Sequence, residues 1–170
     1  MTIQKTAALT ACGVLALTAL SFTLPRHVSV ERAAQVAAAP ETILALAASN
    51  TGYQSFNPYK TLDPDLRIDL YGPSAGVGSG FHFDSKDGTG RQTVAEVTPE
   101  RVTYTVDLGP MGQPTQSIRA VPAANGAEVT WRVDADMGFN PVFRVMGLFM
   151  DAMMGPTFEL GLENLADATA

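Results

Sequence analysis

A glycine-rich stretch, YGPSAGVGSGFHF, is the first part of the sequence whose residue types could do chemistry. It runs from Tyr71 to Phe83 and holds four glycines. Such loops bind phosphate when a helix begins directly after the glycines, because its first amide groups then point at the anion. Here the alternation typical of a strand follows, and the stretch matches neither the dinucleotide-binding nor the P-loop pattern. The pattern therefore argues against a nucleotide ligand.

The glycines instead predict a deformed strand. Gly76, Gly78 and Gly80 are spaced by two, so we expect them to share one face of a strand. Glycines at such positions let a sheet bend or let another backbone approach closely. A strongly curved sheet can wrap around a helix.

Titratable side chains are present, but they do not form a readable catalytic group. His82 alternates with two phenylalanines, so it is expected on the solvent face if those rings point inward. Glu96 is also expected to face outward, and so are Asp69 and Tyr71. An enzyme would need at least one positioned proton-transfer group.

Two pairs of carboxylates lie near predicted element ends. Asp134 and Asp136 flank the end of a strand, where they could bind a cation or lie in a solvated turn; we favour the turn. Asp151 and Glu159 bracket a predicted helix break and are expected to cap it. Neither pair has a histidine nearby in the sequence.

Metals, cofactors and nucleic acids are disfavoured by composition. Cys12 is the only cysteine, and His27 and His82 are the only histidines, so no zinc-ligand spacing exists. The formal net charge is −6, and residues 26–170 carry −7 because Lys5 is the one charge before them. An acidic body lacks the basic footprint that nucleic-acid binding needs. No cofactor or metal is expected.

The first residues predict a hydrophobic segment, 1–25, ahead of a single domain, 26–170. Residues 7–24 carry no charge, and a run of about 18–20 apolar residues can just cross a bilayer as a helix. We favour a retained signal anchor because no clear cleavage site follows. The alternatives are a cleaved signal peptide, which would leave a secreted or periplasmic domain, and a lipoprotein signal at LTAC, which ends at Cys12. Membrane orientation stays open.

The rest of the chain predicts an α+β domain. A first strand is expected over 28–36 and a short helix from Pro40, followed by a loop with three aromatic residues. From Leu66 the apolar pattern has period two, in about six runs separated by turn residues. Asp-Gly and Asn-Gly pairs mark two hairpins. From Asn140 the period becomes helical, and we expect a break at Gly155 and Pro156.

This order of elements, together with four sequence stretches, resembles the START-like (SRPBCC) helix-grip superfamily, and within it the polyketide cyclase/dehydrase and lipid-transport family. The stretches are YGPSAGVGSGFHF, TVAEVTPERVTYTVDL, AEVTWRV and MDAMMGPTFELGLENL. The resemblance covers about residues 28–165. The order of elements is similar to that of small membrane-anchored bacterial members of the family. It implies a curved antiparallel sheet of six to seven strands wrapped on a long C-terminal helix. An additional N-terminal hydrophobic helix is expected.

The resemblance also implies a cavity for an apolar or lipid-like ligand between the sheet and the C-terminal helix. Relatives often carry tryptophans in the loop after the first helix, and aromatic residues stand there in this chain. Val142, Val145, Met146, Phe149 and Met153 fall on one helical stripe, which we expect to pack on the sheet. The predicted ligand-binding residues are Tyr53, Phe56, Tyr59, Tyr104, Trp131, Met146, Met150 and Met153.

Three functions are compatible with these observations. We favour a non-catalytic module that binds an apolar small molecule near a membrane, because no inward acid–base pair can be identified. The alternative is a small cyclase- or dehydratase-like enzyme on the same scaffold. A third is a ligand-free structural envelope protein, which a cavity filled solidly by side chains would favour.

Overall fold

The computed structural model describes residues 21–170. The predicted hydrophobic segment, with Cys12, therefore lies almost entirely outside the described residues. Within residues 21–170, no helix combines the length and the apolar character needed to cross a membrane.

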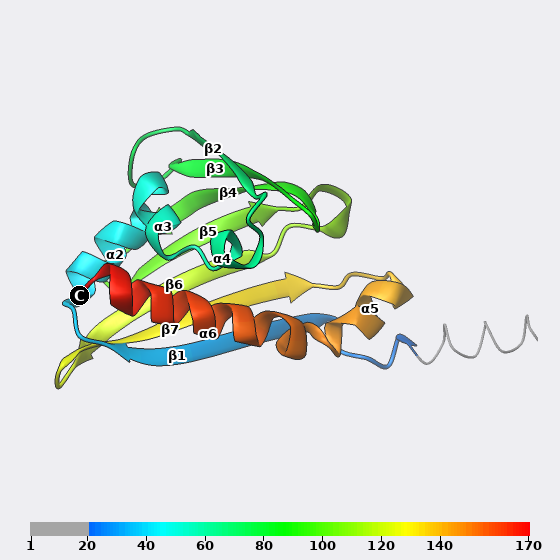
Figure 1. Ribbon diagram of the computed structural model, residues 1–170. Helices are drawn as coiled ribbons and strands as arrows, with labels where there is room; N and C mark the ends of the chain where they lie inside the picture. The colour runs from blue at the N-terminus through cyan, green and yellow to red at the C-terminus, as the bar shows by residue number, and fades with distance from the viewer. Residues whose placement is uncertain (1–20) are drawn as a thin grey trace, which may run out of the picture.

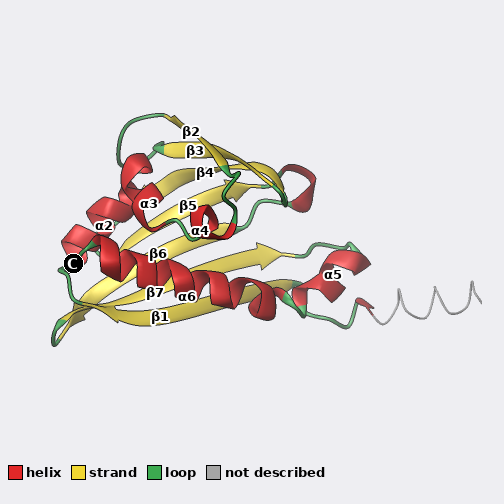
Figure 2. Ribbon diagram, viewed as in Figure 1, coloured by secondary structure: helices red, strands yellow, loops and turns green. Residues whose placement is uncertain are grey.

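The described chain forms one seven-stranded antiparallel sheet with helices on one face (Figures 1 and 2). The strand order is β1-β7-β6-β5-β4-β3-β2. The strands are β1 (His27–Val36), β2 (Arg67–Tyr71), β3 (Gly80–Ser85), β4 (Gly88–Val97), β5 (Arg101–Asp107), β6 (Thr115–Ala123) and β7 (Gly126–Asp136). The helices are α2 (Pro40–Ala48), α3 (Asn50–Phe56), α4 (Tyr59–Leu62), the 3-10 turn η1 (Gly109–Met111), α5 (Pro141–Gly147) and α6 (Met150–Ala168).

Consecutive strands from β2 to β7 pair as a meander. β1 pairs with β7 and forms one edge of the sheet. The two predicted hairpins are confirmed. Gly88 and Gly126 follow the turn residues Asp87 and Asn125 and have φ angles of 135° and 128°. Those angles favour glycine, because a Cβ is strained there.

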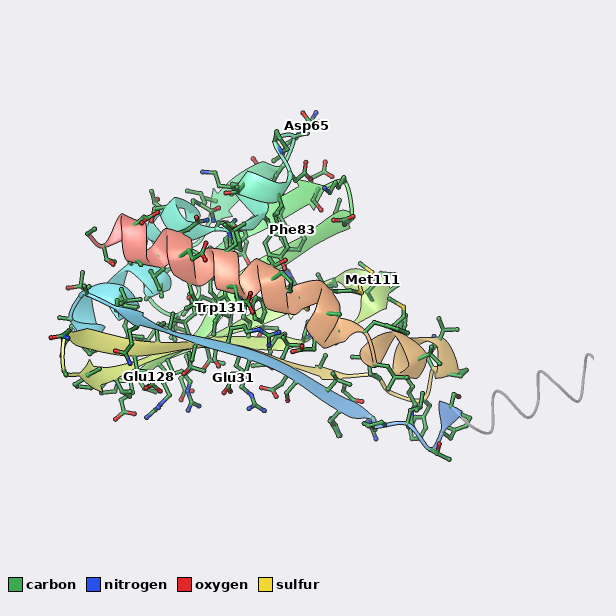
Figure 3. All side chains as sticks on the ribbon, turned by 60° about the horizontal axis from the view of Figure 1, so that its bottom comes forward. Glu31, Asp65, Phe83, Met111, Glu128 and Trp131 are labelled. Carbon is green, nitrogen blue, oxygen red and sulfur yellow. The ribbon has the colours of Figure 1, made fainter. Side chains whose placement is uncertain are left out.

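The long helix α6 crosses the sheet over β1 and β7, while α2 lies on β5 and β6 (Figure 1). Period-two alternation divides each strand between the helix side and the solvent side. Trp131 points from β7 toward α6, whereas Glu31 and Glu128 point away from it (Figure 3). The predicted α+β fold with a long C-terminal helix is thus confirmed.

The glycine-rich stretch is a loop for most of its length, so the prediction of one glycine strand is wrong. Gly76 and Gly78 have φ angles of 85° and 87°, and β3 begins only at Gly80. A Cβ on Gly72 would lie 2.2 Å from the carbonyl oxygen of Gly78, so the loop folds back on itself. Close backbone approach is found at Gly80, where a Cβ would lie 2.5 Å from the Gln92 carbonyl oxygen.

The helical region also differs from expectation. The break falls at Leu148 and Phe149, between α5 and α6, and α6 continues through Gly155 and Pro156. The exposed Pro156 leaves no donor toward residue 152, yet the flanking turns are held by packing on the sheet. The aromatic loop is largely helical as well, because Ser49 caps α3 by accepting a hydrogen bond from the Gly52 amide.

The predicted apolar stripe exists, but it does not pack on the sheet. Its members face solvent because α5 turns away from the sheet and α6 begins with a new phase after the break. The residues concerned are Val142, Val145, Met146, Phe149 and Met153. A second stripe that the same period predicts is the one that α6 buries: Phe158, Gly161, Leu162 and Leu165, together with Gly155.

Candidate functional site

An aromatic cluster fills the space between the sheet and the C-terminal half of α6. Trp131 lies at its centre with no exposed surface. Its ring stacks on Phe158 of α6 at 5.4 Å between centroids. The edges of Tyr53 and Phe56, both from α3, meet it at 6.0 and 5.7 Å. Tyr104 joins the cluster through Tyr53, at 5.6 Å.

A small polar group lies inside this cluster. The Tyr53 hydroxyl accepts a hydrogen bond from Gln116 Nε2 at 3.0 Å and also hydrogen-bonds with the Gln92 side chain. Burial raises the pKa of Tyr53 above its usual value, more than the two glutamines lower it. The phenol therefore stays neutral, and the group can orient a polar atom but cannot take up a proton at neutral pH.

Tyr104 ties a helix to the sheet. Its hydroxyl donates a hydrogen bond to the Ala47 carbonyl in α2 at 2.8 Å. Burial raises the pKa of Tyr104 well above its usual value. This hydroxyl is therefore a neutral donor that is already used inside the protein.

The enclosed space left beside the cluster is small. Its volume is about 10 Å³, which is close to the least that a single water molecule needs. Ser79 Oγ lines it and is buried without a hydrogen-bond partner within residues 21–170. Trp131 Nε1 is likewise buried and without a partner in the described chain. This particular space therefore holds one water molecule at most.

The structure separates the predicted ligand-binding residues into two groups. Tyr53, Phe56, Tyr104 and Trp131 come together in the aromatic cluster, where they are fully buried. The others lie outside this cluster. Tyr59 is 39% exposed, Met146 and Met153 face solvent, and Met150 is partly buried against the core.

Sequence reasoning missed Arg32, which connects β1 to α6. Its position opposite Trp131 places it on the helix side of the sheet. The guanidinium donates to both oxygens of Asp151, at 2.8 and 3.0 Å, and to Glu159 at 2.7 Å. The expectation that Asp151 and Glu159 cap a helix break is therefore wrong. The alternation of Val30, Arg32 and Ala34 could have predicted this placement.

The inward glutamines were missed too, although their signal is in the sequence. Gln92 is in phase with Val94, and Gln116 is in phase with Ile118. Period two therefore places both amides on the helix side. The prediction of the inner face used only the apolar residues of these strands.

The outward predictions are confirmed in their placement. His82 and Glu96 are exposed on the solvent face. Asp69, His82, Arg91 and Asp107 stand directly opposite one another across β2 to β5. They line a solvent-open depression of about 450 Å³. Arg91 and Asp107 are paired there at 2.9 Å.

The strand-end carboxylates are engaged by arginines. Asp134 pairs with Arg132 at 2.6 Å and Asp136 pairs with Arg26 at 2.7 Å. Hydrogen bonds from these arginines lower the pKa of both carboxyls. Among residues 21–170, no group of three or more His, Cys, Asp or Glu side chains is arranged to hold a metal ion.

Sequence comparison identifies the family. Residues 27–169 match the family described as polyketide cyclase / dehydrase and lipid transport. The chain belongs to this family, as the helix-grip arrangement of a curved sheet and a long C-terminal helix indicates. No curated protein matches the chain.

Solved structures with low sequence identity share the fold. Norcoclaurine synthase from Thalictrum flavum, solved with a transition-state analogue, has a TM-score of 0.64 at 14% identity and covers 84% of this chain and 94% of its own. Protein CV1439 from Chromobacterium violaceum has a TM-score of 0.61 at 15% identity, covering 84% and 97%. StfQ, a di-domain aromatase/cyclase from the steffimycin biosynthetic pathway, has a TM-score of 0.61 at 14% identity, covering 84% and 50%. These neighbours share the helix-grip fold with this chain.

Proposed function

We propose that the chain is a non-catalytic protein that binds an apolar small molecule between the sheet and the N-terminal half of α6. One observation carries the proposal: the two halves of the helix cover the sheet differently. The C-terminal half is sealed by the aromatic cluster around Trp131. Ile68, Phe83, Met150 and Met154 pack on the core but are only partly buried, and the two methionines lie in the N-terminal half of α6.

Partly buried apolar side chains suit an adaptable binding surface. Met150 and Met154 are unbranched and polarizable, so they can move to fit ligands of different shape. Phe83 belongs to β3, which lies near the opposite edge of the sheet from β1 (Figure 3). A ligand placed here would extend the apolar core outward without displacing the aromatic cluster.

A non-catalytic role agrees with the chemistry of the inward polar groups. Tyr53 and Tyr104 have pKa values raised by burial, and their other polar neighbours are amides. The buried carboxylate of Asp63 already accepts hydrogen bonds from the Asp65 and Lys86 amides. A general acid or base needs a pKa near the working pH, and the two buried tyrosines do not offer one.

The competing proposal with an observation of its own is a ligand-free structural role. The tight aromatic cluster and the enclosed space of about 10 Å³ favour it. It differs from the binding role in one respect that can be measured, because it predicts no uptake of an apolar probe by the folded chain.

The test uses an apolar fluorescent probe and two tryptophan variants of a chain beginning at Ser21. Met150→Trp should fill the proposed site and weaken probe binding about tenfold or more, with little loss of stability; a true core would lose about 1–3 kcal/mol. Met153→Trp is the matched control, because Met153 is 64% exposed on the same helix. Native mass spectrometry of the purified chain should show a retained lipid-like ligand.

Three outcomes would count against the proposal. The parent chain could fail to bind the probe, which would support the structural role. Both variants could bind the probe as well as the parent, which would place the ligand elsewhere. Met150→Trp could lose stability without any probe binding in the parent, which would make Met150 an ordinary core residue.

A further inference from the structure

Helix α5 has its polar and apolar faces reversed relative to a helix on a water-soluble domain. Its buried residues are Arg144, only 7% exposed, and Gly147. Its exposed residues include Val142, Val145 and Met146. Amphipathic helices of soluble proteins normally turn their apolar stripe to the core and their charges to water.

The apolar face of α5 continues into the residues on both sides of the helix. Phe139 precedes α5 and is 72% exposed. Leu148 and Phe149 follow it in the break before α6, and Met153 lies in the first turns of α6. We call this surface the α5 patch: Phe139, Val142, Val145, Met146, Leu148, Phe149 and Met153.

Arg144 fixes the start of the domain to this same place. Its Nη1 donates to the carbonyl oxygens of Phe22, at 3.0 Å, and Leu24, at 3.2 Å. Its guanidinium also lies 5.2 Å from the centre of the Phe22 ring. Phe22 and Leu24 are the last residues of the uncharged run 7–24. The apolar run therefore joins the domain directly beside the α5 patch (Figure 1).

We propose that the α5 patch docks on the surface of a lipid bilayer in which residues 7–24 anchor the chain. The buried Arg144 sets the geometry, because it holds the end of the run against the helix that carries the patch. Phe22 is itself half-exposed, and it borders the patch because the Arg144 guanidinium lies within 5.2 Å of its ring centre and 6.0 Å of that of Phe139. An interfacial apolar helix face of this kind enters about 5–10 Å into the boundary between headgroups and acyl chains.

The charges beside the patch select an uncharged lipid surface. Arg26 is paired with Asp136 at 2.7 Å and lies 5.1 Å from the Phe139 ring centre. Arg144 is committed to backbone carbonyls. Asp151, in the first turn of α6, is paired with Arg32 at 2.8 Å. Docking should therefore depend on apolar contact and change little with salt, whereas electrostatic docking is screened by it.

The test places a dye on the full chain in phosphatidylcholine vesicles that carry a nitroxide lipid. Cys12→Ser removes the native thiol, and Phe149→Cys or Val145→Cys then gives a labelling site in the patch. Glu128→Cys is the control, because Glu128 lies on the opposite side of the sheet from α6 (Figure 3). The nitroxide should quench the dye at positions 149 and 145 and leave the dye at 128 largely unquenched.

Removing apolar area should undock the patch while the anchor stays. Phe139→Ser combined with Met153→Ser should lower the docking equilibrium, read from a dye at position 145, by about tenfold or more, because a buried apolar side chain contributes roughly 1.5–3 kcal/mol. Val77→Ser is the matched control, since Val77 is 63% exposed in the β2–β3 connection, away from α5. That change should leave the quenching unaltered.

Three results would overturn the proposal, and they differ from one another. Equal quenching at positions 149 and 128 would show that the patch does not meet lipid. Energy transfer between differently labelled copies, without lipid quenching at 149, would assign the patch to a second copy of the chain. A dye at 149 that is shielded from aqueous iodide and from nitroxide lipid alike, with no energy transfer, would mean that residues 7–24 fold onto the patch.

Discussion

Gly161 in α6 lies against the indole of Trp131 with no space for a side-chain carbon between them. A Cβ at position 161 would stand 2.4 Å from Trp131 Cζ3. The close approach brings the helix onto the sheet where the aromatic cluster is densest. Glycine at this position therefore sets the distance between the two layers.

Gly161→Ala should destabilise the domain even though alanine favours helices. Overpacking costs about 1–3 kcal/mol, which offsets the helix-propensity gain of about 1 kcal/mol. Urea unfolding measures the change. In a double-mutant cycle, Trp131→Phe should relieve the clash, because phenylalanine lacks the outer ring atoms. Additive losses in that cycle would show that the two residues are not coupled.

Two glycines in the stretch from Tyr71 to Phe83 should respond differently to substitution. Gly78 has a φ of 87°, and a Cβ there would make only ordinary contact with Pro73, whereas a Cβ at Gly80 would lie 2.5 Å from the Gln92 carbonyl oxygen. Gly78→Ala should cost about 1–2 kcal/mol, and Gly78→Asn less, since asparagine tolerates positive φ. Gly80→Asn should bring no such rescue over Gly80→Ala.

Thermal unfolding of these variants measures the difference. Lys86→Ala is the surface control and should stay within about 0.5 kcal/mol. If every glycine variant fell within that range, the stretch would be a loose loop without a defined conformation.

The Tyr53 hydroxyl should contribute to stability through its partner. Tyr53→Phe leaves the buried Gln116 amide without its acceptor at 3.0 Å, which costs about 1–3 kcal/mol. Combining it with Gln116→Leu should restore part of the loss, because both polar groups are then removed. An unchanged denaturation midpoint in Tyr53→Phe would contradict the structural role of this hydrogen bond.

Acid should weaken the domain through its strand-end carboxylates. The hydrogen bond from Arg26 lowers the pKa of Asp136 in the folded state, below the unfolded value of about 3.9. A lowered folded pKa adds stability above the unfolded value, and that stability is lost as pH falls further. Asp136→Asn should flatten the pH dependence of the urea midpoint below about pH 4. Arg26→Gln should flatten it less than Asp136→Asn, because the Gly138 amide still donates to Asp136, and the double variant should behave like Asp136→Asn.

The domain should fold without the hydrophobic segment, as the first strand begins at His27. The structure sharpens this expectation. A chain starting at Ser21 keeps both hydrogen bonds from Arg144, whereas one starting at Pro25 loses them. Both chains should unfold cooperatively, with the longer one melting at the higher temperature. A molten chain from Ser21 would place the segment in the core.

The period-two pattern predicted the strands well, because one face of this antiparallel sheet packs on the core and the other faces water. It placed Trp131, Tyr104 and His82 on their correct sides. The same alternation contains Arg32 and Gln116, but a polar residue on an inner face is explained only by its partner. Those partners, Asp151 and Tyr53, come from distant helices. The spacing of residues within one strand does not predict a partner in another element.

The helical stripe from Val142 to Met153 shows the limit of periodicity. The period correctly indicates helix, but it cannot say which side faces the sheet. Arg144 decides that question, because its hydrogen bonds to Phe22 and Leu24 turn the charged face inward. The predicted cavity meets a similar limit, since the volumes of Tyr53, Phe56 and Phe158 fill space that a ligand was expected to occupy.

The pairing of β1 with β7 determines when the sheet can be completed. These are the first and the last strand along the chain, so Arg26 and Asp136 meet although they are 110 positions apart. During ribosomal synthesis β1 emerges first, and its hydrogen-bonding edge stays unpaired until all the other strands have been made. Contacts between such distant residues slow folding, because a long loop must close before they form. The vulnerable species in the life of this protein is therefore the nascent chain, in which β1 has been made and β7 has not.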